Sequence, residues 1–294
     1  MKILVIGSQG QLGWDLLKEA KAFGFEATGF DLPQIDIRIK SDVEQIISDF
    51  SPTIVVNAAA YTNVDKAEEE RDVCFAANCF GPENIAAVCN SLSIPLIHIS
   101  TDYVFDGSAN TPYTETDKIS PINVYGKSKA EGEILVRNII EKHIIIRTSW
   151  LYGIHGNNFV KTILRLGKEK EVISVVSDQY GSPTFATDLS NAVLTISSQI
   201  KNGNSNIWGT YNFCGAGITT WHGFAEKIIE EAKQYMQIKT TMVKPIASKD
   251  YPVKAGRPSY SALDCSLIKR QFGISPKPWQ ESLKASIKII CSNT

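Results

Sequence analysis

The sequence lacks the features that mark membrane, secreted and nucleic-acid-binding proteins. No apolar run approaches the roughly 18 residues that a membrane span needs. Basic and acidic side chains nearly cancel, with 30 Lys+Arg against 31 Asp+Glu, whereas a nucleic-acid-binding protein usually carries a basic face. No cleavage pattern of a signal peptide follows the opening MKILVIG. We therefore expect a cytoplasmic protein with neither membrane nor nucleic-acid partners.

Metal-binding and disulfide patterns are also scarce. The six cysteines include no Cys-x-x-Cys pair, and no histidine stands at zinc-ligand spacing from one of them. Free thiols in a reducing compartment are the favoured interpretation. His98, inside the apolar stretch LIHIS, is expected to be structural. The sequence thus predicts no metal site.

What the sequence does contain is an alternation of short apolar runs with amphipathic segments. The runs KILVIG, EATGF, TIVVN, PLIHIS and HIIIRTS are predicted as strands. Helices are expected over 11–23, 41–50 and 71–92, the second opening with a capping box of Ser41 and Glu44. Continuous Val/Ile runs separated by helices predict an α/β fold with a doubly wound parallel sheet of Rossmann type.

A glycine-rich turn directly follows the first predicted strand. The stretch GSQGQLG repeats glycine at every third position between a strand and a helix. Such glycines permit a tight turn and close approach of the main chain to a pyrophosphate, which the helix N-terminus attracts. Glycine needed for packing alone is the alternative. The turn predicts dinucleotide contacts from Gly7, Gln9, Gly10, Gln11, Leu12 and Gly13.

Residues after the next two strands extend the predicted dinucleotide site. Asp31 follows the second strand, where a carboxylate accepts from a ribose 2′-hydroxyl and repels a 2′-phosphate. This leans towards NADH and leaves NADPH open. Asp36 and Ile37 are expected beside the adenine. Small residues after the third strand would let a cofactor lie close over the sheet, namely Ala58, Ala59 and Ala60.

Tyr125 and Lys129 form a second motif, in the stretch PINVYGKSKAEGE. Residues four apart share one face of a helix, so both should face the cofactor edge of the sheet. A nearby ammonium lowers the pKa of a phenol from about 10 and makes it a better general acid. Thr101, at the end of the fourth strand, would orient the substrate oxygen. A solvated helix start is the alternative for this spacing alone.

These stretches resemble the extended short-chain dehydrogenase/reductase family, and within it the reductases of nucleotide 4-keto-6-deoxy sugars. The similar segments span nearly the whole chain: GSQGQLG, VVNAAAYTNVDKAE, STDYVFDG, TETDKISPINVYGKSKAEGE, RTSWLYGIHGNNF, DQYGSPT and AGRPSYSALD. The resemblance implies hydride transfer from NADPH or NADH to C4 of the sugar. It implies a catalytic set of Thr101, Tyr125 and Lys129. It also implies a nucleotide-sugar site formed by Thr101, Asp102, Tyr103, Val104, Tyr125, Trp150, Asn157, Asn158 and Arg257.

Two of these substrate residues have clear physical roles. Arg257 can bind a diphosphate with two parallel hydrogen bonds, and Trp150 can face a 6-deoxy methyl group. A surface ion pair and core packing are the respective alternatives.

On the dinucleotide evidence, residues 1–150 are predicted as an NAD(P)-binding Rossmann domain with return segments at about 172–215. Residues 151–171 and 216–294 are predicted as a smaller substrate-binding domain.

Relatives within the family suggest other activities. Dehydratases carry Thr-Asp-Glu, whereas this chain has tyrosine at position 103, so loss of water is not expected. Epimerisation of a nucleotide sugar stays open. A non-catalytic relative would be a regulatory subunit of an S-adenosylmethionine synthetase, but the Thr, Tyr and Lys of the catalytic set are all present.

Some family members bind Mg²⁺ at a homodimer interface through acidic residues. Asp15 and Asp188 fall near the matching positions. Asp15 is shorter than the expected glutamate, and no third ligand is evident near the C-terminus. Mg²⁺ is therefore not favoured, and a homodimer stays open. Asp15 is instead interpreted as a charge in the first turn of a helix.

Overall fold

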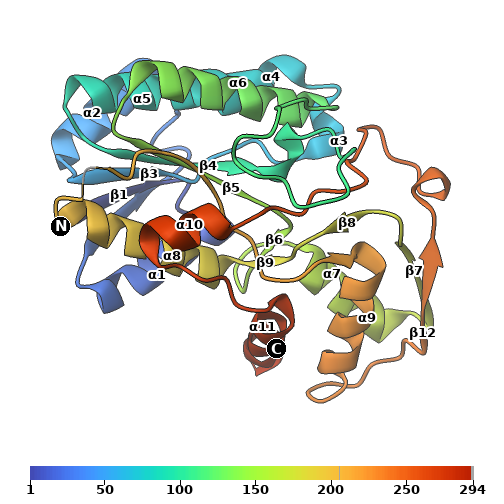
Figure 1. Cartoon of the computed structure of the whole chain (residues 1–294). Coiled ribbons are helices and arrows are strands. Elements are labelled where there is room, and N and C mark those ends of the chain that lie inside the picture. The colour runs from blue at the N-terminus through green and yellow to red at the C-terminus, as the bar shows by residue number, and fades with distance from the viewer. Residues whose placement is uncertain (205, 293–294) are drawn as a thin grey trace.

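A parallel sheet forms the centre of the molecule. The computed structural model describes residues 1–204 and 206–292, and its 6-stranded sheet has the order β10-β5-β4-β3-β1-β2 (Figure 1). Each neighbouring pair of strands is parallel. The predicted doubly wound α/β fold is confirmed. The strands are β1 Lys2–Ile6, β2 Glu26–Phe30, β3 Ile54–Asn57, β4 Leu96–Thr101, β5 His143–Thr148 and β10 Gly209–Asn212.

The strand order changes direction between β1 and β3. From β1 the chain first adds β2 on one side, and it then adds β3, β4, β5 and β10 on the other. Helices that leave such a switch point on opposite faces of the sheet open a crevice at the carboxyl ends of the strands. The topology therefore locates a ligand site before any side chain is considered.

Helices cover both faces of this sheet. Figure 1 shows α1, α8 and α10 on one face and α2, α5 and α6 on the other. Their bounds are α1 Gln11–Ala20, α2 Lys40–Phe50, α5 Gly81–Ser91, α6 Val124–Ile139, α8 Ala186–Lys201 and α10 Ser266–Phe272. Single 3₁₀ turns lie at Lys21–Phe23, Asp102–Val104 and Ser248–Asp250. No helix among the described residues is both long and apolar enough to cross a membrane.

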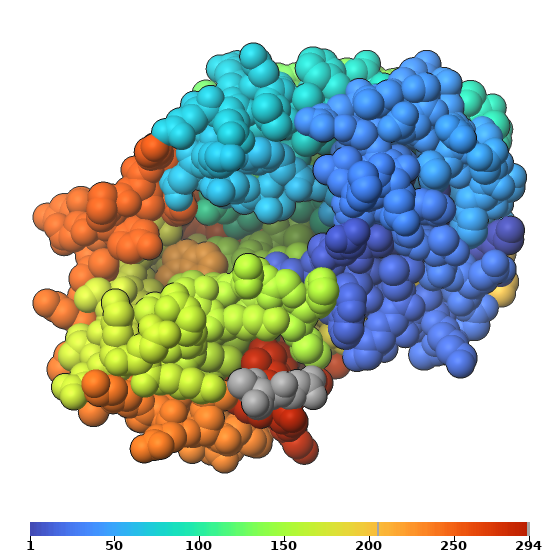
Figure 2. All heavy atoms as spheres, turned by 180° about the vertical axis from the view of Figure 1, so that it is seen from behind, coloured from blue at the N-terminus to red at the C-terminus, as the bar shows by residue number. Residues whose placement is uncertain are grey.

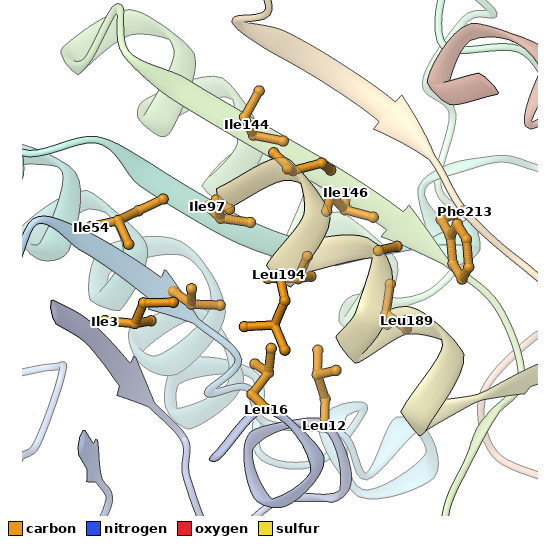
Figure 3. Close-up of a cluster of buried hydrophobic side chains, with 14 of the residues drawn as sticks. Ile3, Leu12, Leu16, Ile54, Ile97, Ile144, Ile146, Leu189, Leu194 and Phe213 are labelled. Carbon is orange, nitrogen blue, oxygen red and sulfur yellow. The ribbon is translucent and has the colours of Figure 1, made fainter. Parts of the chain in front are cut away.

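Two apolar clusters fill the space between the sheet and its helices. Successive side chains of a strand point to opposite faces, so Ile3 of β1 joins one cluster and Leu4 joins the other. Figure 3 shows the first cluster, in which Ile3 and Ile97 from the sheet meet Leu16 of α1 and Leu194 of α8. Burial on both faces explains why these strands are continuous apolar runs.

Two helix predictions differ from the structure. The segment expected as one helix over 71–92 is interrupted by a π-helical turn at Ala76–Phe80, between α4 (Arg71–Phe75) and α5. A short α3 (Val64–Ala67) precedes it. The capping box is wrong, because α2 begins two residues too early for Ser41 to be its N-cap. Ile39 is the N-cap, and no side chain bonds to that helix end.

The second half of the chain builds a smaller lobe beside the sheet (Figure 1). Aromatic side chains dominate its core, where Phe224 lies against Tyr152, Phe159 and Trp279. Three helices surround them, α7 Phe159–Glu169, α9 Trp221–Ala232 and α11 Trp279–Ser292. Two-stranded pairs complete the lobe: β6 Leu151–Tyr152 with β9 Thr184–Phe185, β8 Tyr180–Gly181 with β11 Thr219–Thr220, and β7 Val172–Val176 with β12 Met242–Ile246.

The chain crosses between lobe and sheet several times. β7 lies within the return segment expected at about 172–215, yet it pairs with β12 of the lobe. α8 and β10 do return to the sheet. The exact limits of the two domains stay a prediction.

Candidate active site

A cavity of about 710 Å³ lies at the carboxyl ends of the central strands. Figure 2 shows it as a hollow between the N-terminal part of the chain, in blue and cyan, and the yellow-green segment after residue 150. The predicted site residues that form its wall are Gly7, Gln9, Gly10, Gln11, Leu12, Asp31, Asp36, Ile37, Ala58, Ala59, Ala60, Thr101, Asp102, Tyr103, Tyr125, Lys129, Trp150 and Asn157. Gly13, Val104, Asn158 and Arg257 are not wall residues.

The glycine turn leaves no room for side chains. Gly7 has a φ of +84°, and a Cβ there would lie 2.4 Å from the amide nitrogen of Ala59. A Cβ on Gly13 would lie 2.1 Å from the carbonyl oxygen of Gly7. Gly13 therefore allows α1 to pack closely against the turn. Gly10 is the N-cap of α1, and no side chain occupies that helix end. The first-turn amides of α1 therefore suit an anionic ligand such as a pyrophosphate.

Asp31 ties the glycine turn to the end of β2. One carboxylate oxygen accepts from the Leu32 amide at 2.8 Å, and the other accepts from the Gln9 amide at 2.9 Å. Arg38, which the sequence analysis missed, also lines the cavity and donates to Asp36, with Nη2 at 2.5 Å from Oδ2. That hydrogen bond lowers the pKa of Asp36. This end of the cavity thus holds a carboxylate and a guanidinium, which favour a ribose hydroxyl and a 2′-phosphate respectively.

Thr101, Tyr125 and Lys129 meet on the wall of the same cavity. Thr101 ends β4, and its hydroxyl donates to Asp102 at 3.0 Å and accepts from the Tyr103 amide at 3.2 Å. The ring of Tyr103 meets that of Tyr125 edge-on, with centroids 5.6 Å apart. The chain from β4 into its 3₁₀ turn therefore packs directly against the start of α6.

The start of α6 is closely fitted. Asn123 is its N-cap and accepts from the Gly126 amide at 2.7 Å. A Cβ on Gly126 would lie 2.1 Å from the carbonyl oxygen of Tyr103, so only glycine allows this approach. Capping and close packing together aim Tyr125 into the cavity from the first turn of the helix.

The electrostatics of the tyrosine and lysine differ from the expectation. Burial raises the pKa of Tyr125, while a hydrogen bond with Thr101 acts in the opposite direction. Burial lowers the pKa of Lys129 to about 8. The expected lowering of the Tyr125 pKa by Lys129 is therefore wrong, because burial outweighs it. Lys129 donates to the Ile99 carbonyl at 2.7 Å. Desolvation of its ammonium lowers the pKa of Lys129 more than the charges of Glu133 and Cys74 raise it.

A buried polar chain that the sequence analysis missed stands behind Lys129. The Ala59 amide donates to Asn57 Oδ1 at 3.1 Å, which turns Asn57 Nδ2 towards His98 Nδ1 at 3.1 Å. His98 Nδ1 must then accept, so neutral His98 carries its proton on Nε2. That nitrogen lies 3.4 Å from Lys129 Nζ. Two donors face each other there, which disfavours the protonated lysine. The sequence signal was one histidine in an apolar strand.

A second buried cluster anchors α6 to the sheet. Glu133 is fully buried, and one of its oxygens accepts from Ser100 at 2.6 Å and from Arg147 Nε at 2.9 Å. The other oxygen accepts from Arg147 Nη2 at 2.7 Å and Arg137 Nη1 at 3.1 Å. This network joins α6, β4 and β5 directly beneath the cavity. Tyr125 and Lys129 lie on the same helix as Glu133, so the network fixes the helix that carries them.

The expected substrate residues are more dispersed. Trp150 has a φ of 47°, rare for a residue with a side chain, and its ring stacks on Trp221 with centroids 3.7 Å apart. Asn158 caps α7 by accepting from the Lys161 amide, and it donates to Gln11 Oε1 at 3.0 Å. Val104 is a fully buried core residue. Asn158 and Val104 therefore serve the framework around the cavity.

Arg257 lies outside the cavity wall but close to it. Its guanidinium pairs with Asp65 of α3, with Nη2 at 2.7 Å from Oδ2. Its charge acts on Tyr103, which is a wall residue. Asp65 was not singled out from the sequence, because its partner stands far along the chain.

The two acidic residues considered for Mg²⁺ bond to other side chains of the chain. Asp188 accepts from Lys277 Nζ at 3.1 Å and from the Ser282 hydroxyl. Asp15 accepts from the Thr187 hydroxyl at 3.2 Å, and burial raises its pKa to about 6. Within 1–204 and 206–292, no group of three or more His, Cys, Asp or Glu could hold a metal ion. The first-turn interpretation of Asp15 is wrong, because the first turn of α1 contains no acidic residue.

Comparisons with known proteins agree along the whole chain. The model of the family described as RmlD substrate binding domain matches residues 1–291. A dTDP-4-dehydrorhamnose reductase of Aggregatibacter actinomycetemcomitans is 42% identical over 285 residues, covering 96% of this chain and 97% of that protein. A crystal structure of a dTDP-4-dehydrorhamnose reductase from Clostridium acetobutylicum has a TM-score of 0.92 at 39% identity and covers 99% of both chains. The Bacillus anthracis dTDP-4-dehydrorhamnose reductase, solved in complex with NADP, has a TM-score of 0.90 at 39% identity, covering 98% of this chain and 99% of that one.

Proposed function

The chain belongs to the RmlD substrate-binding domain family, and from this premise we propose that it reduces the C4 keto group of dTDP-4-dehydro-L-rhamnose with NAD(P)H. The product is dTDP-L-rhamnose, a nucleotide-sugar precursor of cell-surface polysaccharides. We place this reaction in the cytoplasm. The observation that supports the assignment most is that Thr101, Tyr125 and Lys129 line the same cavity as the glycine turn.

The cofactor end of the cavity fits a nicotinamide dinucleotide. When bound, NAD(P)H supplies the hydride that reduces C4. The amides at the start of α1 would hold its pyrophosphate, because no side chain caps them and the glycines of the turn have no side chains that would block the approach. Ala58, Ala59 and Ala60 would lie under the cofactor, and Lys129 would donate to the nicotinamide ribose. Asp31 and Arg38 at the ribose end leave the choice between NADH and NADPH to measurement.

Tyr125 is proposed as the proton donor to the C4 oxygen. Burial raises its pKa, so the phenol is protonated at neutral pH, as a general acid must be. Thr101 would hydrogen-bond the same oxygen through its hydroxyl. A protonated Lys129 would offset the negative charge that the phenol acquires as it gives up its proton.

The substrate end is proposed to bind the sugar and its diphosphate. The Trp150 ring, which stacks on Trp221 and lines the cavity, would offer an apolar surface to the C6 methyl group. Tyr103 and Asn157 line the sugar pocket. Arg257 would bind the diphosphate. These contacts separate a nucleotide sugar from a free sugar, because only the former carries the charged group that Arg257 recognises.

The test is a coupled absorbance and product assay. Purified protein is mixed with NADH or NADPH and dTDP-4-dehydro-L-rhamnose, and nicotinamide absorbance at its reduced maximum is followed. We expect oxidation of the cofactor and formation of dTDP-L-rhamnose. Turnover confined to another nucleotide 4-keto-6-deoxy sugar would move the substrate assignment within the family. An epimer formed without net cofactor oxidation would replace reduction by epimerisation. Absence of turnover with either cofactor would favour the regulatory-subunit alternative.

A further inference from the structure

One carboxylate joins two distant parts of the chain beside the cavity. Asp65 lies on α3 and accepts hydrogen bonds from residues 254–257, which we call the strap. In Figure 2, orange atoms of this part of the chain meet cyan atoms at one edge of the hollow. Asp65 Oδ1 accepts from the Lys254 amide at 3.2 Å and the Ala255 amide at 3.1 Å. Amide hydrogen bonds to an ionised carboxylate are among the stronger polar contacts of a folded chain. The strap is thus tied to α3 by its main chain.

The same carboxylate determines how Arg257 is oriented. Arg257 Nη1 donates to Asp65 Oδ1 at 3.1 Å, and Nη2 donates to Oδ2 at 2.7 Å. The second hydrogen of Nη1 is directed to the Ala255 carbonyl at 3.3 Å. Three of the five guanidinium hydrogens are therefore used.

The two remaining hydrogens lie on one edge of the guanidinium. They belong to Nε and Nη2, and neither has an acceptor among residues 1–204 and 206–292. Nε and Nη2 form the side-on fork of an arginine, which matches two oxygens of a phosphate. Asp65 therefore occupies one edge of Arg257 and leaves the other available for an anion.

The strap is also connected to the helix that carries Tyr125. Asn123, the N-cap of α6, donates from Nδ2 to the Gly256 carbonyl at 2.7 Å. The Val124 amide at the same helix start donates to Glu68, at the end of α3, at 2.8 Å. Gly256 is the immediate neighbour of Arg257, so the guanidinium is placed relative to both α3 and the start of α6.

We propose that Asp65 is a positioning residue for substrate binding, which holds Arg257 so that its Nε–Nη2 edge receives the diphosphate of the nucleotide sugar. This inference rests on the proposed function, because it names the anion as the diphosphate of that substrate. Asp65 need not touch the substrate. It acts through Arg257, and its own negative charge opposes the binding of an anion.

Because the charge of Asp65 opposes anion binding, the charge effect and the positioning effect predict opposite changes in affinity when Asp65 is replaced. By Coulomb attraction alone, replacing Asp65 with asparagine removes a nearby negative charge and should strengthen anion binding. If positioning dominates, the same replacement frees Arg257 to rotate and should weaken binding. We expect Asp65→Asn to weaken the affinity for dTDP about tenfold, the size of a lost charge-assisted hydrogen bond. In turnover, KM should rise while kcat changes less than about twofold.

Glu69 provides the matched control. It lies on the same segment and pairs with Lys254, the neighbouring basic residue of the strap. Glu69→Gln removes the same amount of charge at nearly the same place without touching Arg257. We expect its dTDP affinity to stay within about twofold of the unsubstituted protein, because exposed ion pairs contribute little.

The experiment measures dTDP binding by titration calorimetry for the unsubstituted protein, Asp65→Asn, Glu69→Gln, Arg257→Lys and the double variant Asp65→Asn/Arg257→Lys. Arg257→Lys keeps the charge but lacks the fork, so Asp65→Asn should cause no further loss in that background. Unchanged or tighter binding by Asp65→Asn overturns the inference. So does an equal loss in both backgrounds, or a matching loss of NADPH affinity, since either indicates a general structural effect. If the unsubstituted protein fails to bind dTDP, the proposed substrate falls, and this inference falls with it.

Discussion

The two ends of the cavity are built on different principles. The cofactor end is a continuous βα unit in which main chain and glycine form the wall, and its fit depends on the absence of side-chain atoms. At the proposed substrate end, Trp150 of the cavity wall stacks on Trp221, and Arg257 pairs with Asp65 close to the wall. These residues come from segments far apart in the sequence, and stacked rings and an ion pair hold them. We therefore expect binding at the first end to be sensitive to added side-chain volume, and binding at the second end to be sensitive to changes of charge.

Tyr125 lies where the two ends meet, and its replacement should cause the largest effect on turnover. Tyr125→Phe removes only the hydroxyl, so both binding ends keep their shape. We expect kcat to fall about 10³-fold, within the range for loss of a general acid, while NADPH and dTDP affinities stay within about twofold. Stopped-flow turnover and calorimetric titration measure the two quantities. A variant that keeps full kcat would remove Tyr125 as the proton donor.

In the framework under both ends, loss of a charge should lower the stability of the fold itself. Glu133→Ala leaves the guanidinium of Arg147 buried without its carboxylate, and breaking a buried pair from one side costs about 3–5 kcal/mol. The free energy of unfolding, measured in urea, should fall by that amount. Arg137→Gln is the control, because Arg137 is the partly exposed partner of the same glutamate and should cost about 1 kcal/mol or less. Equal losses in the two variants would contradict a role for burial.

Volume at the cofactor end can be tested with one methyl group. Gly7→Ala places a Cβ 2.4 Å from the Ala59 amide nitrogen at a φ of +84°, so both sterics and backbone strain oppose it. We expect NADPH affinity to fall about 100-fold, equivalent to two pKd units, with dTDP affinity much less affected. Gly24→Ala is a matched control, since Gly24 has a φ of +68° but nothing within 4 Å of its added Cβ. If both variants bind NADPH equally well, the close approach has no bearing on the cofactor.

The same contrast explains what the sequence reveals. The central strands were predicted almost to the residue, because strands buried on both faces are continuous apolar runs. The cavity-wall residues around the glycine turn could also be predicted, because the glycines and Asp31 lie within one or two neighbouring elements. The π-helical turn at Ala76–Phe80 was missed because no Pro or unusual spacing marks it.

Contacts between distant segments were beyond reach from a single sequence. Asp65 reads as an ordinary surface charge, and Arg257, predicted as a diphosphate ligand, has no identifiable ion-pair partner until the fold brings the two together. The pairing of β7 with β12 was missed for a related reason. Several side chains of these strands are exposed, so the apolar pattern does not identify the partner. Which residue contacts which is a property of the tertiary structure, and it decides the substrate end.

The smallest predicted effect concerns pH and the lysine between the two ends. Burial lowers the pKa of Lys129 to about 8, although Glu133 and Cys74 act to raise it. The proposed mechanism needs the protonated lysine, so kcat/KM should fall as the pH rises through about 8. The unfolded chain holds this proton up to about pH 10.4, so between these values the folded state binds fewer protons. This one group should therefore make the protein more stable as pH rises through that window.

His98 should influence the pH at which kcat/KM falls, which is the alkaline limb of the pH profile. It directs an N–H at Lys129 Nζ, and its own pKa is lowered by burial and by the charges of Lys129, Arg137 and His143, so it stays neutral. In His98→Gln, the amide oxygen can turn towards Lys129 and accept a hydrogen bond from its ammonium, which should move the limb upward by about one pH unit. His143→Gln, on the adjacent strand, should leave the limb in place. A limb that stays at the same pH in His98→Gln would show that His98 does not contribute to the pKa of Lys129, which burial, Glu133 and Cys74 would then set.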